Sequence, residues 1–223
     1  MPLYDKIPVY FVPGLGASSK IFENIKLPEN QYAVHYLDWI PPKDKKESIQ
    51  NYARRMCAAV KEANPVLVGV SFGGLMVQEM SKIIPVKKTI IISSIKSRDE
   101  LPRSLKWASA TCAYKILPYK KMMNVDNLAK FAFGKSAKKR INLYRKYIYI
   151  SSENYLPWAF GQMLNWNPEN NNNIKTIHIH GDKDHIFPIK NITNCEVIAG
   201  GTHTMILIKS KPIAKLLTQF IDN

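Results

Sequence analysis

The sequence predicts an α/β fold in which a mostly parallel central sheet is covered by helices on both faces. Short apolar segments alternate with segments of helical periodicity along most of the 223 residues. Continuous apolar runs joined by helices are typical of parallel strands that are buried on both faces. The expected strands cover 7–12, 31–38, 66–70, 88–94, 174–180 and 194–198, and the expected helices cover 47–63, 72–84 and 204–221.

The clearest functional pattern follows the third expected strand. There the chain reads Gly69-Val70-Ser71-Phe72-Gly73 and continues directly into a helix-like segment. Gly-x-Ser-x-Gly between a strand and a helix is typical of a nucleophile elbow, a tight turn that exposes the serine hydroxyl. A side chain at 69 or 73 is expected to clash with neighbouring backbone. The alternative is a glycine-rich turn without a catalytic role.

An activated serine requires a base, and the base requires a group that orients it. The C-terminal third contains candidates for both. The strand expected at 174–180 runs into the loop 181–188, which contains two aspartates, and the next strand runs into a loop with His203. Loops at the ends of strands are where open α/β sheets carry their sites. We therefore expect His203 to be the base.

The first expected strand opens into the glycine-containing loop Pro13-Gly14-Leu15-Gly16. Such a loop can present the backbone N–H of Leu15 opposite that of Phe72, which begins the helix after Ser71. Two donors of this kind form an oxyanion hole, in which each donor typically contributes ~3–4 kcal/mol to catalysis.

These four motifs, at 13–16, 69–73, 181–188 and 200–203, occur in the order found in α/β-hydrolases, and the chain resembles that superfamily over nearly its whole length. The resemblance implies an α/β-hydrolase fold and a catalytic triad in the order serine, acid, histidine. The chain is also similar, in its size and in the spacing of its motifs, to small carboxylesterases of the carrier-linked methyl ester esterase type. One departure is Pro13, since many relatives have histidine before the glycine.

The resemblance assigns the acid to Asp184, because the orienting aspartate in related sequences stands four residues before a proline, here Pro188. Asp182 is an alternative, although its position also suits a turn cap. Asp99 remains open as well, since some relatives take the acid from the loop after the preceding strand.

The other four histidines have simpler interpretations as packing or surface residues: His35, His178, His180 and His185. The spacing His178-x-His180, with aspartates close by, also resembles a metal site. The hydrolase pattern already explains the aspartate, so we expect no metal and no cofactor.

The segment 95–173 interrupts the alternation of strands and helices. Its apolar residues recur at helical spacing, and the resemblance implies a helical cap inserted into a single domain that covers 1–223. Four of its side chains are candidates for substrate contact: Trp107, Met122, Trp158 and Met163. The alternative is that such residues only attach the insert to the sheet.

Positive charge is concentrated in this insert. The chain has a net charge of +15, and residues 96–146 contain 14 basic and three acidic residues. A positive rim beside an apolar pocket favours encounters with anionic partners, such as an acidic acyl carrier protein or CoA. The alternative is a basic surface that only maintains solubility. No nucleic-acid-binding module is recognisable, so we expect no nucleic-acid partner.

The three cysteines, Cys57, Cys112 and Cys195, have no paired spacing. We expect Cys57 in a helix, Cys112 in the insert and Cys195 in a strand, all as reduced, buried thiols of a cytoplasmic protein. The N-terminus lacks the pattern of a signal peptide. No segment reaches the ~20 apolar residues of a transmembrane helix.

The predicted function is that of a serine hydrolase that cleaves a small-molecule carboxylic ester or thioester through an acyl-enzyme. Two alternatives remain. A ligand-binding protein can retain this fold with slow or no turnover, and an acyltransferase would pass the acyl group to an acceptor other than water.

Overall fold

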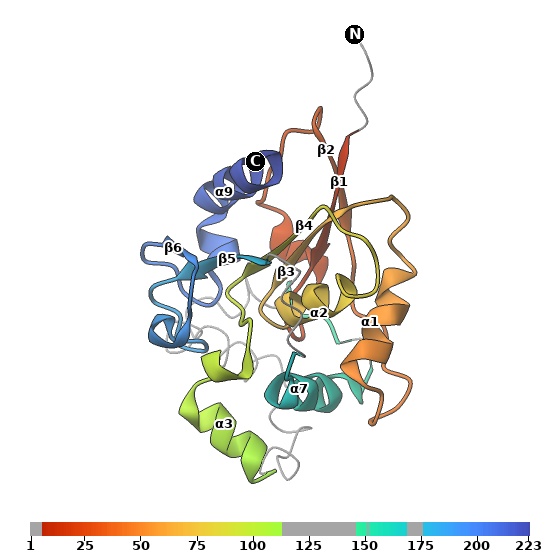
Figure 1. Cartoon of the computed structure of the whole chain (residues 1–223), viewed down its shortest axis with the longest axis vertical. Coiled ribbons are helices and arrows are strands. Elements are labelled where there is room, and N and C mark those ends of the chain that lie inside the picture. The colour runs from red at the N-terminus through yellow and green to blue at the C-terminus, as the bar shows by residue number, and fades with distance from the viewer. Residues whose placement is uncertain (1–5, 113–145, 151, 169–175) are drawn as a thin grey trace.

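Six parallel strands form one sheet in the order β2-β1-β3-β4-β5-β6 (Figure 1). The computed structural model describes residues 6–112, 146–150, 152–168 and 176–223, and the statements below concern those residues. The strands are β1 (Ile7–Val12), β2 (Tyr32–Tyr36), β3 (Val66–Val70), β4 (Lys88–Ile92), β5 (Thr176–Gly181) and β6 (Glu196–Ile198). The predicted parallel sheet is confirmed.

Two of the expected strands are shorter than predicted at one end, for identifiable reasons. The strand expected at 88–94 ends at Ile92, because Ser93 has a φ of 49° and leaves the extended conformation. The strand expected at 194–198 begins at Glu196, because Asn194 has a φ of 47°. Cys195 therefore precedes β6 and does not lie in a strand, contrary to prediction. Such departures bring the chain out of the sheet near the carboxyl ends of β4 and the start of β6.

The helices also differ in length from those predicted. They are η1 (Ser19–Phe22), α1 (Ile49–Cys57), α2 (Phe72–Met80), η2 (Arg98–Glu100), α3 (Arg103–Ala110), α7 (Tyr155–Asn165), η5 (Ile189–Asn191), α8 (Met205–Ile208) and α9 (Ser210–Asp222). The helix expected at 47–63 begins only after Ser48, whose hydroxyl caps it by accepting a hydrogen bond from the Asn51 N–H at 3.2 Å. The closing helix is divided at Lys209 into α8 and α9.

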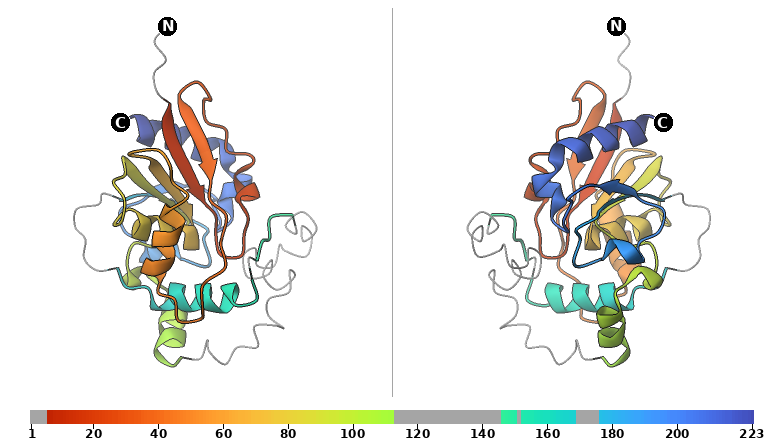
Figure 2. Two further views of the ribbon diagram at one scale, coloured as in Figure 1. Left: turned by 90° about the vertical axis from the view of Figure 1, so that its right-hand side faces the viewer. Right: turned by 90° about the vertical axis from the view of Figure 1, so that its left-hand side faces the viewer.

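The two faces of the sheet carry separate hydrophobic clusters, as the alternation of side chains along each strand requires. In β1, Tyr10 and Val12 belong to a cluster that also contains side chains of α1, α2 and α7. Val9 and Phe11 belong to the opposite cluster, which contains side chains of η1 and α9. Figure 1 shows α9 and α1 on opposite sides of the strands, and Figure 2 shows α7 running below them. Coverage of both faces therefore agrees with prediction.

Helices α3 and α7 lie beyond the carboxyl ends of the strands (Figure 1). Both belong to the insert expected at 95–173, and the Ser109 hydroxyl links them by a hydrogen bond of 2.9 Å to the side-chain oxygen of Asn165. Helix α7 is also attached to the start of α1, because the Trp158 indole donates to the backbone oxygen of Glu47 at 2.7 Å. Residues 113–145 of the insert lie outside the described residues.

The cysteines differ from expectation in their exposure. Cys57 is buried in α1 as predicted, whereas Cys195 is half-buried and Cys112 is exposed. Cys112 lies in the turn after α3 with a φ of 53°. The prediction that all three thiols are buried was therefore wrong. Among the described residues, no helix combines the length and apolarity needed to cross a membrane.

Candidate active site

Ser71 occupies the turn between β3 and α2 in a backbone conformation that non-glycine residues rarely adopt. Its φ is 53° and its ψ is −118°, which costs about 1–3 kcal/mol. The end of β4 holds the turn in place. The Ser71 N–H donates to the Ile92 oxygen at 2.9 Å, and the Ser94 hydroxyl donates to the Ser71 oxygen at 2.7 Å. A strained serine at this junction has the geometry of the predicted elbow.

The glycines on either side of Ser71 permit close contact between backbone segments. A Cβ at Gly69 would lie 2.2 Å from the Gly73 oxygen. A Cβ at Gly73 would lie 2.3 Å from the backbone oxygens of Val12 and Pro13. The predicted clash at both positions is confirmed. Gly73 therefore allows α2 to start directly against the end of β1.

Replacing Gly73 with alanine is expected to lower activity and stability together. The new methyl group would clash with the backbone oxygens of Val12 and Pro13, so either α2 or the end of β1 must move. We expect a loss of about 1–3 kcal/mol in the free energy of unfolding and, from a displaced Ser71, about a 100-fold loss of kcat/KM.

Urea unfolding and ester hydrolysis measure the two effects. Gly14→Ala is the matched control for stability, because its Cβ would meet its nearest atom at 3.6 Å, an ordinary contact. Equal stabilities for Gly73→Ala and Gly14→Ala would contradict the steric argument.

Ser71, His203 and Asp184 form a continuous chain of hydrogen bonds. The Ser71 hydroxyl oxygen lies 2.9 Å from Nε2 of His203, and Nδ1 of His203 lies 2.8 Å from Oδ2 of Asp184. The three residues come from the loops that follow β3, β6 and β5. Parallel strands bring these carboxyl-terminal loops to one edge of the sheet. In this arrangement the imidazole can take a proton from the hydroxyl while the carboxylate orients the ring.

The carboxylate of Asp184 is completely buried. Burial alone would raise its pKa, but the neighbouring His203 and the Phe187 N–H outweigh this effect and hold the pKa of Asp184 below its usual value. The Oδ1 atom accepts the N–H groups of Ile186 and Phe187 at 2.8 and 2.9 Å, which leaves Oδ2 for His203. The carboxyl group is therefore ionised and fixed in orientation.

The other two aspartates considered as the acid lie elsewhere. Oδ1 of Asp182 accepts the N–H of Gly200 at 2.7 Å and so connects the loop 181–188 to the loop that contains His203. The side chain of Asp99 is fully exposed, and its nearest cation is Lys106 at 3.9 Å. Of the three candidates, Asp184 is the one that reaches the histidine.

The loop that contains Leu15 lies against Ser71. A Cβ at Gly14 would be 3.6 Å from the Ser71 Cβ. The Gly14 oxygen accepts hydrogen bonds from the Trp39 indole at 2.9 Å and from the Ala17 N–H at 3.1 Å. Because the C=O and N–H of a trans peptide point in opposite directions, the Leu15 N–H points away from Trp39. The Phe72 N–H, at the first position of α2, has no carbonyl partner within its own helix.

Two sets of contacts that hold this loop in place were not predicted from the sequence. One is Trp39, which follows β2 at its carboxyl end and could have been noticed from that position. The other is the segment 146–150 of the insert, in which the Tyr147 oxygen accepts the Ser18 N–H at 2.8 Å and the Tyr149 N–H donates to the Gly16 oxygen at 2.9 Å. This second contact joins residues more than a hundred positions apart, and no local sequence pattern predicts it.

The other four histidines have different surroundings. His178 and His180 are buried and bond to each other, with Nε2 of the first 3.0 Å from Nδ1 of the second. His35 stacks on Tyr10, with ring centroids 4.6 Å apart, and His185 is exposed. Within the described parts of the chain, no group of three or more potential ligands is arranged to hold a metal ion.

The four candidates for substrate contact have different surroundings. Trp158 and Met163 are buried in the hydrophobic cluster that also contains Phe72. The Trp158 ring stacks on Tyr52 at 4.3 Å and meets Phe72 edge-on at 6.1 Å. Trp107 is 66% exposed on α3, and Met122 lies outside the described residues. The structure therefore groups only Trp158 and Met163 with the helix that begins after Ser71.

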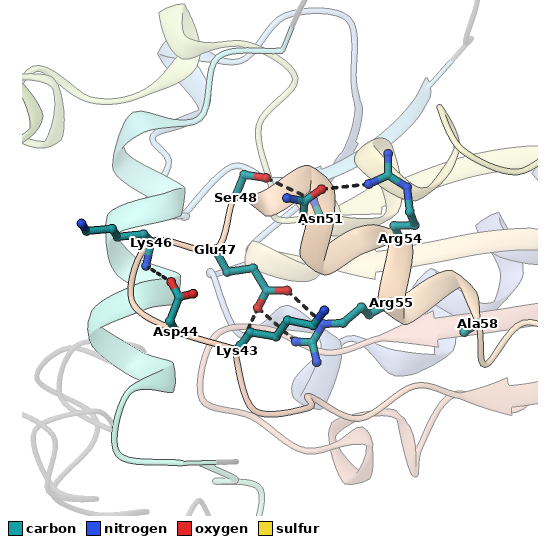
Figure 3. A pocket seen from close by; sticks show the side chains of 9 residues that line it. All are labelled: Lys43, Asp44, Lys46, Glu47, Ser48, Asn51, Arg54, Arg55 and Ala58. Carbon is teal, nitrogen blue, oxygen red and sulfur yellow. Dashed lines mark hydrogen bonds and ion pairs between the residues drawn. The ribbon is translucent and has the colours of Figure 1, made fainter.

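A cavity lies at the start of α1, with a volume of about 690 Å³ (Figure 3). Its lining residues are Lys43, Asp44, Lys46, Glu47, Ser48, Asn51, Arg54, Arg55 and Ala58. Glu47 pairs with Arg55 at 2.9 Å and accepts the Lys43 N–H at 2.7 Å. Among the described residues, no carboxylate pairs with the side chain of Lys43, Lys46 or Arg54, so the cavity keeps an excess of positive charge.

Comparison with known proteins identifies the fold. No family model matches the chain, and no curated protein matches its sequence. Among solved structures, BpoC of Mycobacterium tuberculosis H37Rv, described as a non-heme bromoperoxidase, is 14% identical, with a TM-score of 0.74 over 97% of this chain and 92% of its own. A hydrolase from Pseudomonas aeruginosa PA01 is 12% identical, with a TM-score of 0.72 over 98% and 91%. A lipase-esterase related protein from Clostridium acetobutylicum ATCC 824 is 17% identical, with a TM-score of 0.68 over 96% and 93%. Together with the six-stranded parallel sheet, these similarities show that the chain has the α/β-hydrolase fold.

Proposed function

We propose that this protein is a serine hydrolase that cleaves a carboxylic ester or thioester through an acyl-enzyme intermediate. The observation that carries the proposal is the chain of hydrogen bonds from Ser71 through His203 to Asp184, at 2.9 and 2.8 Å. The names of two similar structures, a hydrolase and a lipase-esterase related protein, agree with it. Fold alone does not determine function, so the proposal depends on the site.

In the proposed reaction, the Ser71 oxygen attacks the carbonyl carbon while Nε2 of His203 takes the hydroxyl proton. The N–H groups of Phe72 and Leu15 stabilise the oxyanion that forms. His203 then returns the proton to the leaving oxygen or sulfur as its bond to the acyl carbon breaks. Water attacks the acyl-enzyme by the same route, which releases the acid and restores Ser71.

For the acyl side of the substrate, we propose Trp158 and Met163 as part of the pocket wall, because both share a cluster with Phe72. Trp107 is proposed as a peripheral contact, since its side chain is largely exposed. Met122 remains a candidate from the sequence only.

We propose further that the acyl group of the substrate is held by an acidic carrier protein or by CoA. The described cations of the insert give limited support, since Lys96, Lys106 and Lys146 are bound to neighbouring groups of the protein. The cavity beside α1 gives stronger support, because Lys43 and Lys46 lie in a loop attached to α7 through Trp158. A positive surface next to the insert would favour the encounter with an anionic carrier.

The experiment that tests the function is a panel of esters and thioesters of increasing acyl length, offered free, as CoA thioesters and on an acyl carrier protein. Hydrolysis with kcat/KM above about 10⁴ M⁻¹s⁻¹ for at least one member is the expected result. Product analysis with added alcohols or amines would reveal an acyltransferase by diversion of the acyl group. Stoichiometric binding without turnover would favour a ligand-binding protein.

The carrier part of the proposal has a separate readout. The ratio of kcat/KM for carrier-linked over free ester is expected to exceed one at low salt and to fall as salt rises. Lys43→Glu/Lys46→Glu is expected to lower the ratio without changing hydrolysis of the free ester. A ratio near one that does not depend on salt would contradict the proposed acidic carrier but not the proposed hydrolase activity.

A further inference from the structure

Two buried histidines lie next to the loop that contains Asp184, and the proposed reaction does not use them. His178 and His180 project from the same side of β5, and their exposures are 2% and 0%. His180 is adjacent to Gly181, where the chain leaves the strand towards Asp184. An unsatisfied buried polar group is costly, and three of their four ring nitrogens have a hydrogen-bond partner, whereas Nδ1 of His178 has none among the described residues.

The hydrogen atoms of this pair can be assigned from its partners. Nε2 of His180 lies 2.8 Å from the backbone oxygen of Phe187. A carbonyl oxygen only accepts, so Nε2 carries the hydrogen and Nδ1 of the neutral ring is an acceptor. That acceptor lies 3.0 Å from Nε2 of His178, which must therefore be the donor. The Phe187 carbonyl thus fixes the tautomer of His180, and the N–H of His178 stabilises that tautomer.

Neutral rings are favoured at this position. Burial, with help from the neighbouring His180, lowers the pKa of His178 to about 3. Burial also lowers the pKa of His180, although nearby Asp184 opposes this effect. The other charged or titratable groups that act on the pair are His203, Glu100 and Lys96.

His180 holds the far side of the turn that presents Asp184. The Phe187 N–H bonds to Oδ1 of Asp184, while the Phe187 oxygen accepts from His180. The same Nε2 atom lies 3.5 Å from Oδ2 of Asp184, the oxygen that faces His203. The buried ring therefore contacts both the backbone end of the turn and the carboxylate itself. Without it, the carboxylate would keep its charge but lose one of the groups that fix its direction.

We propose that His180 is a positioning residue that aligns Asp184 with His203, and that His178 stabilises the tautomer His180 needs for this role. The inference rests on the proposed hydrolase function. A carboxylate already held in the correct direction requires no rearrangement when the His203 ring becomes charged. Small displacements of such a group are costly, since an error of about 1 Å can reduce a rate by roughly 100-fold.

The test compares His180→Phe with His180→Gln. Phenylalanine fills a similar space but donates no hydrogen bond, whereas the glutamine amide can donate to both Phe187 and Asp184. For His180→Phe we expect kcat to fall about 10–100-fold with KM nearly unchanged. The acid limb of the kcat/KM profile should move to lower pH, because a misaligned carboxylate stabilises the charged form of the base less well. His180→Gln should recover most of the lost kcat.

His185→Gln is the matched control, because His185 adjoins Asp184 in the sequence but is exposed. It should leave kcat and the pH profile unchanged. A His180→Phe variant with kcat within twofold of wild type would overturn the proposal. So would a loss of activity that glutamine does not restore and that leaves the pH profile unmoved, since that result describes packing alone.

A measurement on the wild type is independent of ester turnover and of variant folding. Long-range ¹H–¹⁵N NMR of protein labelled in histidine should show His178 and His180 as neutral Nε2–H tautomers between pH 5 and 8. The same spectra should show a strongly hydrogen-bonded Nδ1–H on His203. Nδ1–H tautomers or charged rings at 178 and 180 would overturn the inference. If the tautomers are as expected but the wild type hydrolyses nothing, the proposed function fails and the assigned hydrogen-bond chain remains.

Discussion

Ser71→Ala is expected to remove esterase activity almost completely, with kcat reduced by about 10⁵–10⁶-fold. The methyl group cannot attack a carbonyl, and no other hydroxyl bonds to Nε2 of His203 in the described residues. The oxyanion donors and the binding surface remain, so a small residual rate over that in water should persist. Alanine at this turn keeps the unusual φ but leaves the surrounding hydrogen bonds of the backbone intact, so the fold should be retained.

Intact-mass measurement after treatment with a fluorophosphonate checks this prediction directly. Wild type should gain one adduct and Ser71→Ala none. Ser104→Ala, an exposed serine on α3, should be labelled like wild type. Labelling of Ser71→Ala would move the nucleophile to another residue. A folded wild type that gains no adduct would instead favour the ligand-binding alternative.

Asp184→Asn is expected to lower kcat by about 10⁴-fold without unfolding the protein. The N–H groups of Ile186 and Phe187 require an oxygen at the Oδ1 position, so the new amide nitrogen must occupy the position of Oδ2. That NH₂ group then donates towards Nδ1 of His203 and forces the hydrogen of the ring onto Nε2. A ring protonated at Nε2 cannot accept the proton of Ser71. The wrong tautomer, and not the loss of charge alone, therefore accounts for the size of the effect.

Asp182→Asn is the matched control for this variant. Its side-chain oxygen can still accept the Gly200 N–H, so kcat should stay within about threefold of wild type. Kinetic measurements and circular dichroism on both variants separate the chemical effect from unfolding. Retained activity in Asp184→Asn together with its loss in Asp182→Asn would reverse the assignment of the acid.

The local sequence was sufficient for the order of elements and for the elbow. β1 and β3 are continuous apolar runs, and Gly69 and Gly73 have the steric role that their spacing predicts. The ends of elements were less predictable. Positive φ at Ser93 and Asn194, neither of them a glycine, shortened two expected strands. Such conformations are stabilised by contacts made across the loops and not by the residue itself.

The sequence by itself determined the class of fold and the loops in which Ser71, the candidate aspartates and His203 lie, because strand periodicity and loop position are local properties of the chain. Only the tertiary structure decided that Asp184 reaches His203 while Asp182 binds Gly200 and Asp99 faces solvent. It also decided that Trp39 binds the loop that contains Leu15 and that His180 contacts the carboxylate of Asp184. These choices depend on how the ends of β2, β5 and β6 come together at one edge of the sheet. Distances between residues far apart in the chain are fixed by packing on both faces of that sheet, and no short segment encodes them.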